Sequence, residues 1–182
     1  STQLLARVYC LCRHSSCRQR GLVAFRVLTV CTGNICRSPS AEAILRSRLA
    51  AAGLGMAIEV DSAGLADYHI GEPPSEPAVR LGACRGYDLS TLRARRVAAG
   101  DFANFDLIHE LDRGHLRQLA ALQPRGSRSR ISLFLEGLPE LGIDVADPYY
   151  GDDGDYAAMF DVIEAAAPSW ISRLQEDLTV RR

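Results

Sequence analysis

The stretch from residue 31 to residue 39 combines residue types that can bind a phosphate group and attack it. It reads Cys-Thr-Gly-Asn-Ile-Cys-Arg-Ser-Pro and joins an apolar run, which predicts a strand, to an amphipathic run, which predicts a helix. Backbone amides that converge at a helix N-terminus attract anions. Gly33 and Asn34 can adopt the positive φ that turns such amides inward. We therefore expect an oxyanion-binding loop between the strand and the helix.

Three side chains of this stretch can carry out chemistry on a bound phosphate. A thiol beside a helix N-terminus ionises more readily than a free thiol, so Cys31 is the expected nucleophile. Arg37 offers a planar guanidinium that can bind two phosphate oxygens at once. Ser38 can hydrogen-bond the thiolate and stabilise it as a leaving group. The other residues expected to bind phosphate are Thr32, Gly33, Asn34, Ile35 and Cys36.

The same stretch strongly resembles the signature of the low-molecular-weight protein tyrosine phosphatases. The resemblance extends over residues 26 to about 175. It implies a phosphotyrosine-protein phosphatase that acts through a cysteinyl phosphate at Cys31 and needs no metal or other cofactor. The implied partners are a phosphotyrosine-containing protein as substrate and inorganic phosphate as product. Further matching motifs are Asp61-Ser62-Ala63-Gly64, His69-Ile70-Gly71-Glu72-Pro73, Arg93-Ala94-Arg95, Phe105-Asp106-Leu107-Ile108, Asp112 and Asp147-Pro148-Tyr149-Tyr150-Gly151.

Hydrolysis also needs a group that protonates the departing oxygen and then activates water. The resemblance assigns this general acid and base role to Asp147, whereas composition alone favours a turn-initiating residue before a proline. The resemblance also implies that Tyr149 and Tyr150 wall the cleft, and exposed turn tyrosines are the alternative. Ser62 resembles the family serine that holds Asn34 in a strained conformation.

Some positions depart from the family pattern. Ser75 and Pro77 stand where the family often has an acidic residue and an arginine, and Leu92 stands where it usually has a histidine. Residues 109–112 read His-Glu-Leu-Asp, where a Met-Asp pair usually ends the third strand. We expect these differences to affect substrate preference and loop order, and not the type of reaction.

Other functions on the same fold stay open. A thiol-dependent arsenate reductase needs further cysteines after Cys31, and Cys84 is the only distal one. In protein-arginine phosphatases, by resemblance, a threonine replaces Ile35. A non-catalytic phosphotyrosine-binding module would result if the altered cleft rim had abolished turnover. Buried structural thiols at a tight turn are the remaining interpretation of Cys31 and Cys36.

The position of Cys31 and Cys36 at the two ends of one loop also predicts redox control. A sulfenic acid formed on Cys31 would meet the Cys36 thiol and close a disulfide that thiols can reverse. This requires Cα atoms no more than ~7 Å apart.

Four apolar runs predict the strands that position this loop. We interpret each run as a buried strand that is apolar along its length and does not alternate in polarity, as expected when both faces of a sheet are covered. The runs are residues 26–30, 58–61, 107–111 and 131–135. Helical patterns separate the runs, and no Asn-Gly hairpin signal occurs between them. The expected fold is therefore α/β, a single doubly wound domain with a four-stranded parallel sheet and helices on both faces.

The first helix is expected to begin at Pro39 and to end at Gly53. Glu42 and Arg46 are expected to pair across one turn on its solvent-exposed side. Further helices are expected over residues 76–85, 113–123 and 156–178. Pro168 must either kink the last helix or restart it.

The composition describes a folded domain with little net charge. The 182 residues, 47% of them apolar, predict one domain with a sizeable core. The formal net charge of −1 does not support a general attraction to nucleic acid. The apolar runs are shorter than the ~18–20 residues that cross a bilayer, so we expect no membrane span. We expect a cytoplasmic protein that is a monomer or a weak dimer.

Residues 1–25 differ in composition from residues 26–182, which we expect to form the catalytic domain. Residues 1–26 hold five arginines, no acidic residue and three of the six cysteines. Their longest apolar run, five residues at positions 8–12, is too short for a signal peptide. We expect a disordered or non-native leader, with a transit peptide as the alternative. The spacing of its possible zinc ligands matches no trusted four-ligand pattern: Cys10, Cys12, His14 and Cys17.

Overall fold

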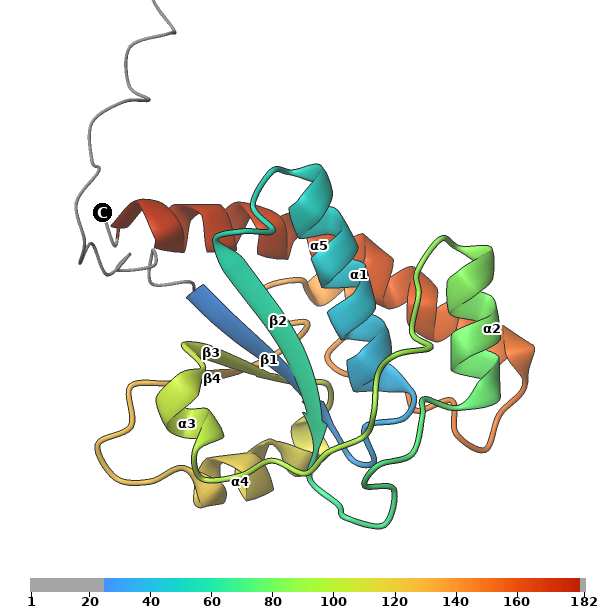
Figure 1. Cartoon of the computed structure of the whole chain (residues 1–182), viewed down its shortest axis with the longest axis horizontal. Helices are drawn as coiled ribbons and strands as arrows, with labels where there is room; N and C mark the ends of the chain where they lie inside the picture. The colour runs from blue at the N-terminus through green and yellow to red at the C-terminus, as the bar shows by residue number, and fades with distance from the viewer. Residues whose placement is uncertain (1–24, 181–182) are drawn as a thin grey trace, which may run out of the picture.

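A four-stranded parallel sheet forms the centre of the computed structural model, which describes residues 25–180 (Figure 1). The strands lie in the order β2-β1-β3-β4, and each neighbouring pair is parallel. The predicted α/β fold with a four-stranded parallel sheet is confirmed. The strand order reverses at β1, so its carboxyl end is the switch point at which open α/β folds bind ligands. The strands are β1 (Phe25–Cys31), β2 (Ile58–Gly64), β3 (Leu107–Glu110) and β4 (Arg130–Leu133).

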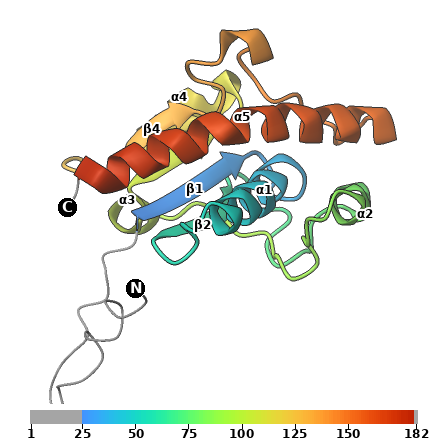
Figure 2. The same cartoon turned by 90° about the horizontal axis from the view of Figure 1, so that it is seen from above.

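Helices cover both faces of this sheet, as predicted. In Figure 1, α1, α2 and α5 lie on one side of the sheet, and α3 and α4 lie on the other. Figure 2 shows α5 running along the sheet beside α1. The helices are α1 (Arg37–Ala51), α2 (Glu76–Cys84), α3 (Asp101–Asn104), α4 (Arg113–Leu122) and α5 (Asp153–Val180), with a short 3-10 helix at Pro139–Leu141.

The core consists of two layers that alternate along each strand. In β1, Val27 belongs to the layer beneath α1 and α5, and Leu28 and Val30 belong to the layer beneath α3 and α4. All three side chains are fully buried. This burial on both faces is the reason why consecutive positions of β1 are apolar. The expectation of a continuously apolar run is wrong for β2, in which Glu59 is exposed and polarity alternates from Ile58 to Asp61.

Helix α1 begins at Arg37 and not at Pro39 as predicted. Pro39 therefore lies within the first turn, where a missing N–H group removes no helical hydrogen bond. The Glu42–Arg46 pair forms at 2.9 Å, but its expected solvent-exposed position is wrong for Glu42, which is only 2% exposed. Burial is tolerated because Ser62 Oγ donates a 2.6 Å hydrogen bond to Glu42 Oε2.

The last helix, α5, is longer than predicted and is continuous through Pro168. Its first turn includes Asp153 and Asp155, which interact favourably with the helix dipole. Ala166, Ala167 and Trp170 on either side of the proline are buried, so packing keeps the helix intact despite one missing backbone hydrogen bond.

The predictions for the N-terminal leader cannot be compared with the structure, which begins at residue 25. The expected leader, residues 1–25, and its possible zinc ligands lie outside the described residues, except that Phe25 begins β1. Within residues 25–180, no helix has the length and apolar character needed to cross a membrane.

Candidate active site

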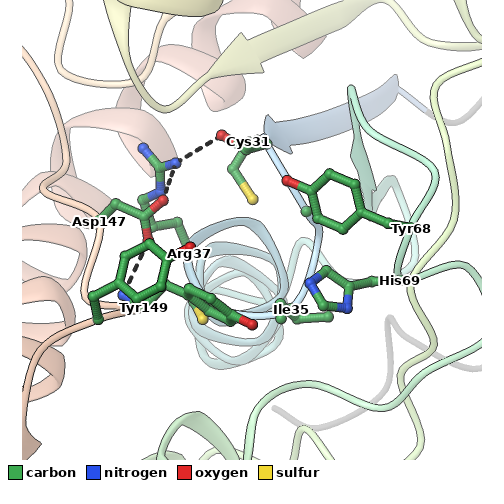
Figure 3. A pocket seen from close by; sticks show the side chains of 11 residues that line it. Cys31, Ile35, Arg37, Tyr68, His69, Asp147 and Tyr149 are labelled. Carbon is green, nitrogen blue, oxygen red and sulfur yellow. Dashed lines mark hydrogen bonds and ion pairs between the residues drawn. The ribbon is translucent and has the colours of Figure 1, made fainter.

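The loop after β1 borders a cavity of about 330 Å³ at the switch point of the sheet (Figure 3). Cys31 ends β1 and is buried, and its Sγ lies 3.1 Å from Ser38 Oγ. In Figure 3 the sulfur lies between Arg37 on one side and Tyr68 on the other. The predicted site residues that line this cavity are Cys31, Thr32, Gly33, Ile35, Cys36, Arg37, Asp147, Tyr149 and Tyr150. The other three predicted residues, Asn34, Ser38 and Ser62, are buried beside the loop.

Asn34 holds the loop in its curved conformation. Its φ of 58° makes it the only residue other than glycine with a positive φ among residues 25–180. Its Nδ2 donates hydrogen bonds of 2.9 Å to Ser38 Oγ and to Ser62 Oγ, and its Oδ1 accepts one of 2.9 Å from the Arg95 backbone. Three hydrogen bonds, one within the loop region and two to other segments, thus fix a backbone conformation that L-residues rarely adopt.

The expected positive φ is not found at Gly33. A Cβ at this position would lie 3.0 Å from His69 Cδ2. Glycine is therefore favoured here because a Cβ would crowd the neighbouring His69 ring, and not because of the backbone conformation.

A chain of buried hydrogen bonds connects the nucleophile to the interior. It runs from Cys31 through Ser38, Asn34 and Ser62 to Glu42. Burial raises the pKa of Glu42, although the Ser62 hydrogen bond and Arg46 oppose this shift. The contact between Ser62 and Asn34 is the one that the family resemblance implies.

Arg37 is held by two carboxylates at the edge of the cavity. Its Nη1 donates to Asp112 Oδ2 at 2.7 Å, and its Nη2 donates to Asp147 Oδ2 at 2.7 Å and to Thr32 Oγ1 at 3.2 Å. The Arg37 side chain is only 4% exposed. The guanidinium therefore has a defined position before any anion binds.

Asp112 is a site residue to which the sequence analysis assigned no role. It is the N-cap of α4, and its carboxylate also accepts from the His115 backbone at 3.1 Å. Burial raises its pKa, but hydrogen bonds from His115 and Arg37 outweigh this effect and hold the pKa below its usual value. An Asp before an amphipathic run predicts an N-cap, but not a contact with an arginine 75 positions away.

Asp147 has the hydrogen bond of a turn residue and also lies at the cavity. Its Oδ1 accepts a hydrogen bond from the Tyr149 backbone at 3.2 Å, as a turn-initiating residue does. Its other oxygen faces the cavity and pairs with Arg37. The side chain is 44% exposed, so it can exchange protons with solvent and with a bound ligand.

Aromatic rings form the walls of the cavity. The Tyr149 and Tyr150 ring centroids are 4.8 Å apart, and Tyr150 is 96% exposed. Tyr68 and His69 supply further wall, with centroids 4.8 Å apart, and were not predicted as site residues. His69 begins one of the motifs that match the family, but that match assigned no role to it, and nothing in the local sequence marks Tyr68. The cavity is therefore shaped for a planar, partly apolar group.

Cys36 packs at the opposite end of the loop from Cys31. Its Sγ lies 3.3 Å from the Tyr156 hydroxyl and 3.4 Å from Ser75 Oγ. Burial raises the pKa of the Cys36 thiol, so this cysteine is a poorer nucleophile than an exposed one. Ser75, one of the departures from the family pattern, also donates its backbone N–H to Ile35 O at 2.8 Å. The substituted residue thus supports the loop.

Comparison with known proteins leads to one family. The family model described as low molecular weight phosphotyrosine protein phosphatase matches residues 26–180. A low molecular weight protein-tyrosine-phosphatase of Streptomyces coelicolor is 37% identical over 163 residues, covering 87% of this chain and 99% of that protein. Low molecular weight protein-tyrosine phosphatase A of Mycobacterium tuberculosis is 41% identical over 145 residues, covering 78% of this chain and 86% of that protein. The crystal structure of a protein tyrosine phosphatase from Entamoeba histolytica matches with a TM-score of 0.79 at 31% identity, covering 85% of this chain and 99% of that one.

Proposed function

The chain belongs to the low molecular weight phosphotyrosine protein phosphatase family, and we propose that it hydrolyses protein phosphotyrosine through a cysteinyl phosphate on Cys31. One observation carries this proposal. Cys31, Arg37 and Asp147 border the same cavity at the carboxyl end of β1. They supply a nucleophile, an anion-binding group and a proton donor, which are the groups that this phosphoryl transfer requires.

In the first step the Cys31 thiolate attacks phosphorus. An S–P bond forms while the P–O bond to the tyrosine breaks. Arg37 and the loop amides stabilise the charge on the three non-bridging oxygens, and they need little reorganisation because Asp112 already orients the guanidinium. Ser38 Oγ, 3.1 Å from the sulfur, donates a hydrogen bond to the thiolate before the attack.

Asp147 protonates the departing phenolate oxygen. Phosphate bound in the loop takes over the hydrogen bonds of Arg37, which releases the Asp147 carboxyl from its 2.7 Å contact. The freed carboxyl then faces the leaving group across the cavity. The proton that Asp147 gives up is restored in the second step.

In the second step water hydrolyses the cysteinyl phosphate. Asp147, now a carboxylate, takes a proton from the attacking water. The oxygen bonds to phosphorus, the S–P bond breaks, and inorganic phosphate leaves. Ser38 stabilises the returning Cys31 thiolate through the same hydrogen bond.

The walls of the cavity support an aromatic substrate. Tyr68, His69, Tyr149 and Tyr150 flank the approach to Cys31, and Ile35 lies at its edge. A planar ring can pack between these groups, whereas a phosphoserine side chain offers no such surface. An isoleucine at position 35 favours tyrosine over the arginine-phosphatase alternative by family resemblance. Arsenate reduction is less well supported because the described cysteines after the loop consist of the exposed Cys84 alone.

The test compares three peptides of one sequence that carry phosphotyrosine, phosphoarginine or phosphoserine. We expect kcat/KM to be at least about tenfold higher for phosphotyrosine, and Cys31→Ser to abolish turnover. Cys84→Ser, which removes an exposed cysteine far from the loop in sequence, is the matched control and should keep full activity. Faster turnover of phosphoarginine would overturn the substrate assignment. More than a tenth of native activity in Cys31→Ser would overturn the nucleophile.

We also infer redox control and a reducing, cytoplasmic location. A thiolate nucleophile stays active only where thiols are kept reduced. Cys36 lies in the same loop as Cys31, so mild peroxide should produce a Cys31–Cys36 disulfide that dithiothreitol reverses. Absence of this crosslink from the mass spectrum of the oxidised chain would contradict the inference. Cys36→Ala should make the inactivation irreversible.

A further inference from the structure

The carboxyl end of β3 holds a buried acid that the proposed reaction does not use. Glu110 has no exposed surface. Its Oε1 accepts a hydrogen bond from the Leu111 backbone at 3.1 Å. Its Oε2 is also buried and has no hydrogen-bond partner among residues 25–180. A buried carboxylate oxygen without a partner is strongly destabilising unless a proton or a cation satisfies it.

Two further donor groups lie beside this oxygen. Glu110, Asp112 and His115 each offer one ligand atom, and these atoms all lie within 4.8 Å of one another. His115 Nδ1 is 2.9 Å from each carboxylate oxygen of Asp112. Nitrogen from one imidazole and oxygen from two carboxylates form a ligand set that suits Zn²⁺ and related divalent ions.

We propose that Glu110, Asp112 and His115 form an inhibitory binding site for a divalent transition-metal cation such as Zn²⁺. The ion has no part in phosphoryl transfer. Its three protein ligands leave a position for water, and it enters from the side of His115, whose side chain is 35% exposed.

The geometry requires only a small adjustment. Zinc–ligand bonds of ~2.0–2.2 Å hold two ligands no more than ~4.4 Å apart, so the three atoms, which lie within 4.8 Å of one another, must move closer together when the ion binds. The Nδ1 atom must bind the ion as a lone-pair donor. The bound ring is therefore neutral with its proton on Nε2, and binding of the ion displaces any proton from Nδ1.

The ion would act on the active site through Asp112. Asp112 Oδ2 accepts the 2.7 Å hydrogen bond that orients Arg37. Coordination would share the negative charge of Asp112 with the ion and bring a second positive charge toward the guanidinium. Arg37 would lose orientation, and turnover would fall although the ion does not touch Cys31. This inhibitory effect depends on the proposed function, whereas ion binding itself does not.

Binding is tested by titrating Zn²⁺ into the full chain in a calorimeter. The parent protein has five cysteines replaced, so that thiolates do not compete for the ion. We expect one zinc ion to bind per chain at this site, and Glu110→Gln to weaken its binding by at least about tenfold. The replacements are Cys10→Ser, Cys12→Ser, Cys17→Ser, Cys31→Ser and Cys84→Ser.

The chain offers a matched control in Glu72→Gln. Glu72 pairs with His69 at 2.6 Å with the same three-residue spacing that separates Asp112 from His115, but its side chain is 56% exposed. Zinc binding should be unchanged in this variant. If Glu110→Gln does not fold, His115→Gln replaces it, because that side chain is partly exposed. No zinc uptake by the parent, or unchanged affinity in the folded ligand variant, would overturn the site.

Inhibition is then measured on chains with all native cysteines. The zinc concentration that halves phosphotyrosine-peptide turnover should be at least about tenfold higher for Glu110→Gln than for Glu72→Gln. Equal half-inhibitory zinc concentrations for the two variants, together with weakened zinc binding by Glu110→Gln, would show that the site binds zinc without controlling the enzyme. A chain that binds zinc normally but lacks phosphatase activity would refute the proposed function and leave the metal site standing.

Discussion

Asn34 provides a prediction whose magnitude follows from the structure. Its side chain makes three hydrogen bonds, with Ser38, Ser62 and the Arg95 backbone. At ~0.5–1.5 kcal/mol each, their loss in Asn34→Gly should lower the free energy of unfolding by about 2–4 kcal/mol. The loop should also become less ordered, so kcat/KM for aryl phosphates should fall.

The comparison of Asn34→Gly with Asn34→Ala isolates the backbone strain. Both variants lose the same hydrogen bonds, but only alanine places a Cβ on a residue with a φ of 58°. The left-handed conformation destabilises alanine by ~1–2 kcal/mol. Glycine has a larger unfolded-state entropy, which offsets ~0.4–1 kcal/mol of that difference. The alanine variant should therefore be the less stable, by up to about 1.6 kcal/mol.

Equilibrium unfolding in urea measures both differences, provided that the variants share one m-value. Asn104, an exposed residue of α3, is the matched control, and there alanine should be at least as stable as glycine. An alanine variant at position 34 that is more stable than the glycine variant would refute the strain argument. A loss below about 1 kcal/mol in both would show that the three hydrogen bonds contribute little.

Asp147→Asn should slow turnover by ~10²–10⁴. The loss should be smaller for leaving groups of low pKa, because these depart without a proton. Equal losses for nitrophenyl and alkyl phosphates, compared by steady-state kinetics, would reject Asp147 as the general acid. Arg37→Lys should be nearly inactive toward aryl phosphates in the same assay, because a point charge cannot span two phosphate oxygens, and activity near native would contradict this. Burial lowers the pKa of His109 to about 3, with Arg130 and Arg173 contributing. Since an unfolded histidine titrates near pH ~6.5, His109 stabilises the fold fully above that pH and progressively less as the pH falls toward 3, at about 1.4 kcal/mol per pH unit. Urea unfolding between about pH 4 and 6 should therefore show a shallower acid slope for His109→Leu than for the parent, and parallel slopes would exclude His109 as the cause.

The sequence predicts the sheet and the phosphate-binding loop because both are encoded locally. Burial on both faces makes the central strand β1 apolar at consecutive positions, as at Val27 and Leu28. The chemistry of the loop is concentrated in nine consecutive residues. Helix boundaries were less accurate, since Pro39 is compatible with several positions in a first turn.

The contacts that the sequence did not predict join distant segments. Besides its predicted partner Arg46, Glu42 has a hydrogen bond from Ser62, which is 20 residues away. This contact allows an acidic residue that the helical pattern places on the solvent-exposed side to be buried. The role of Asp112 depends on Arg37, 75 residues away. Tyr68 reaches the cavity only through the path of the loop after β2. Such pairings are set by the three-dimensional arrangement of the sheet and not by local patterns.

The central claim is that a phosphoryl group is transferred to Cys31. The most direct measurement mixes the full chain with excess aryl phosphate, quenches the reaction with acid during turnover, and analyses the peptides by mass spectrometry. A phosphoryl group on the peptide that contains Cys31 is the predicted result, and Asp147→Asn should prolong its lifetime because water is no longer activated. Phosphate on any other residue, or turnover by the native chain with no phosphopeptide at Cys31, would contradict the account.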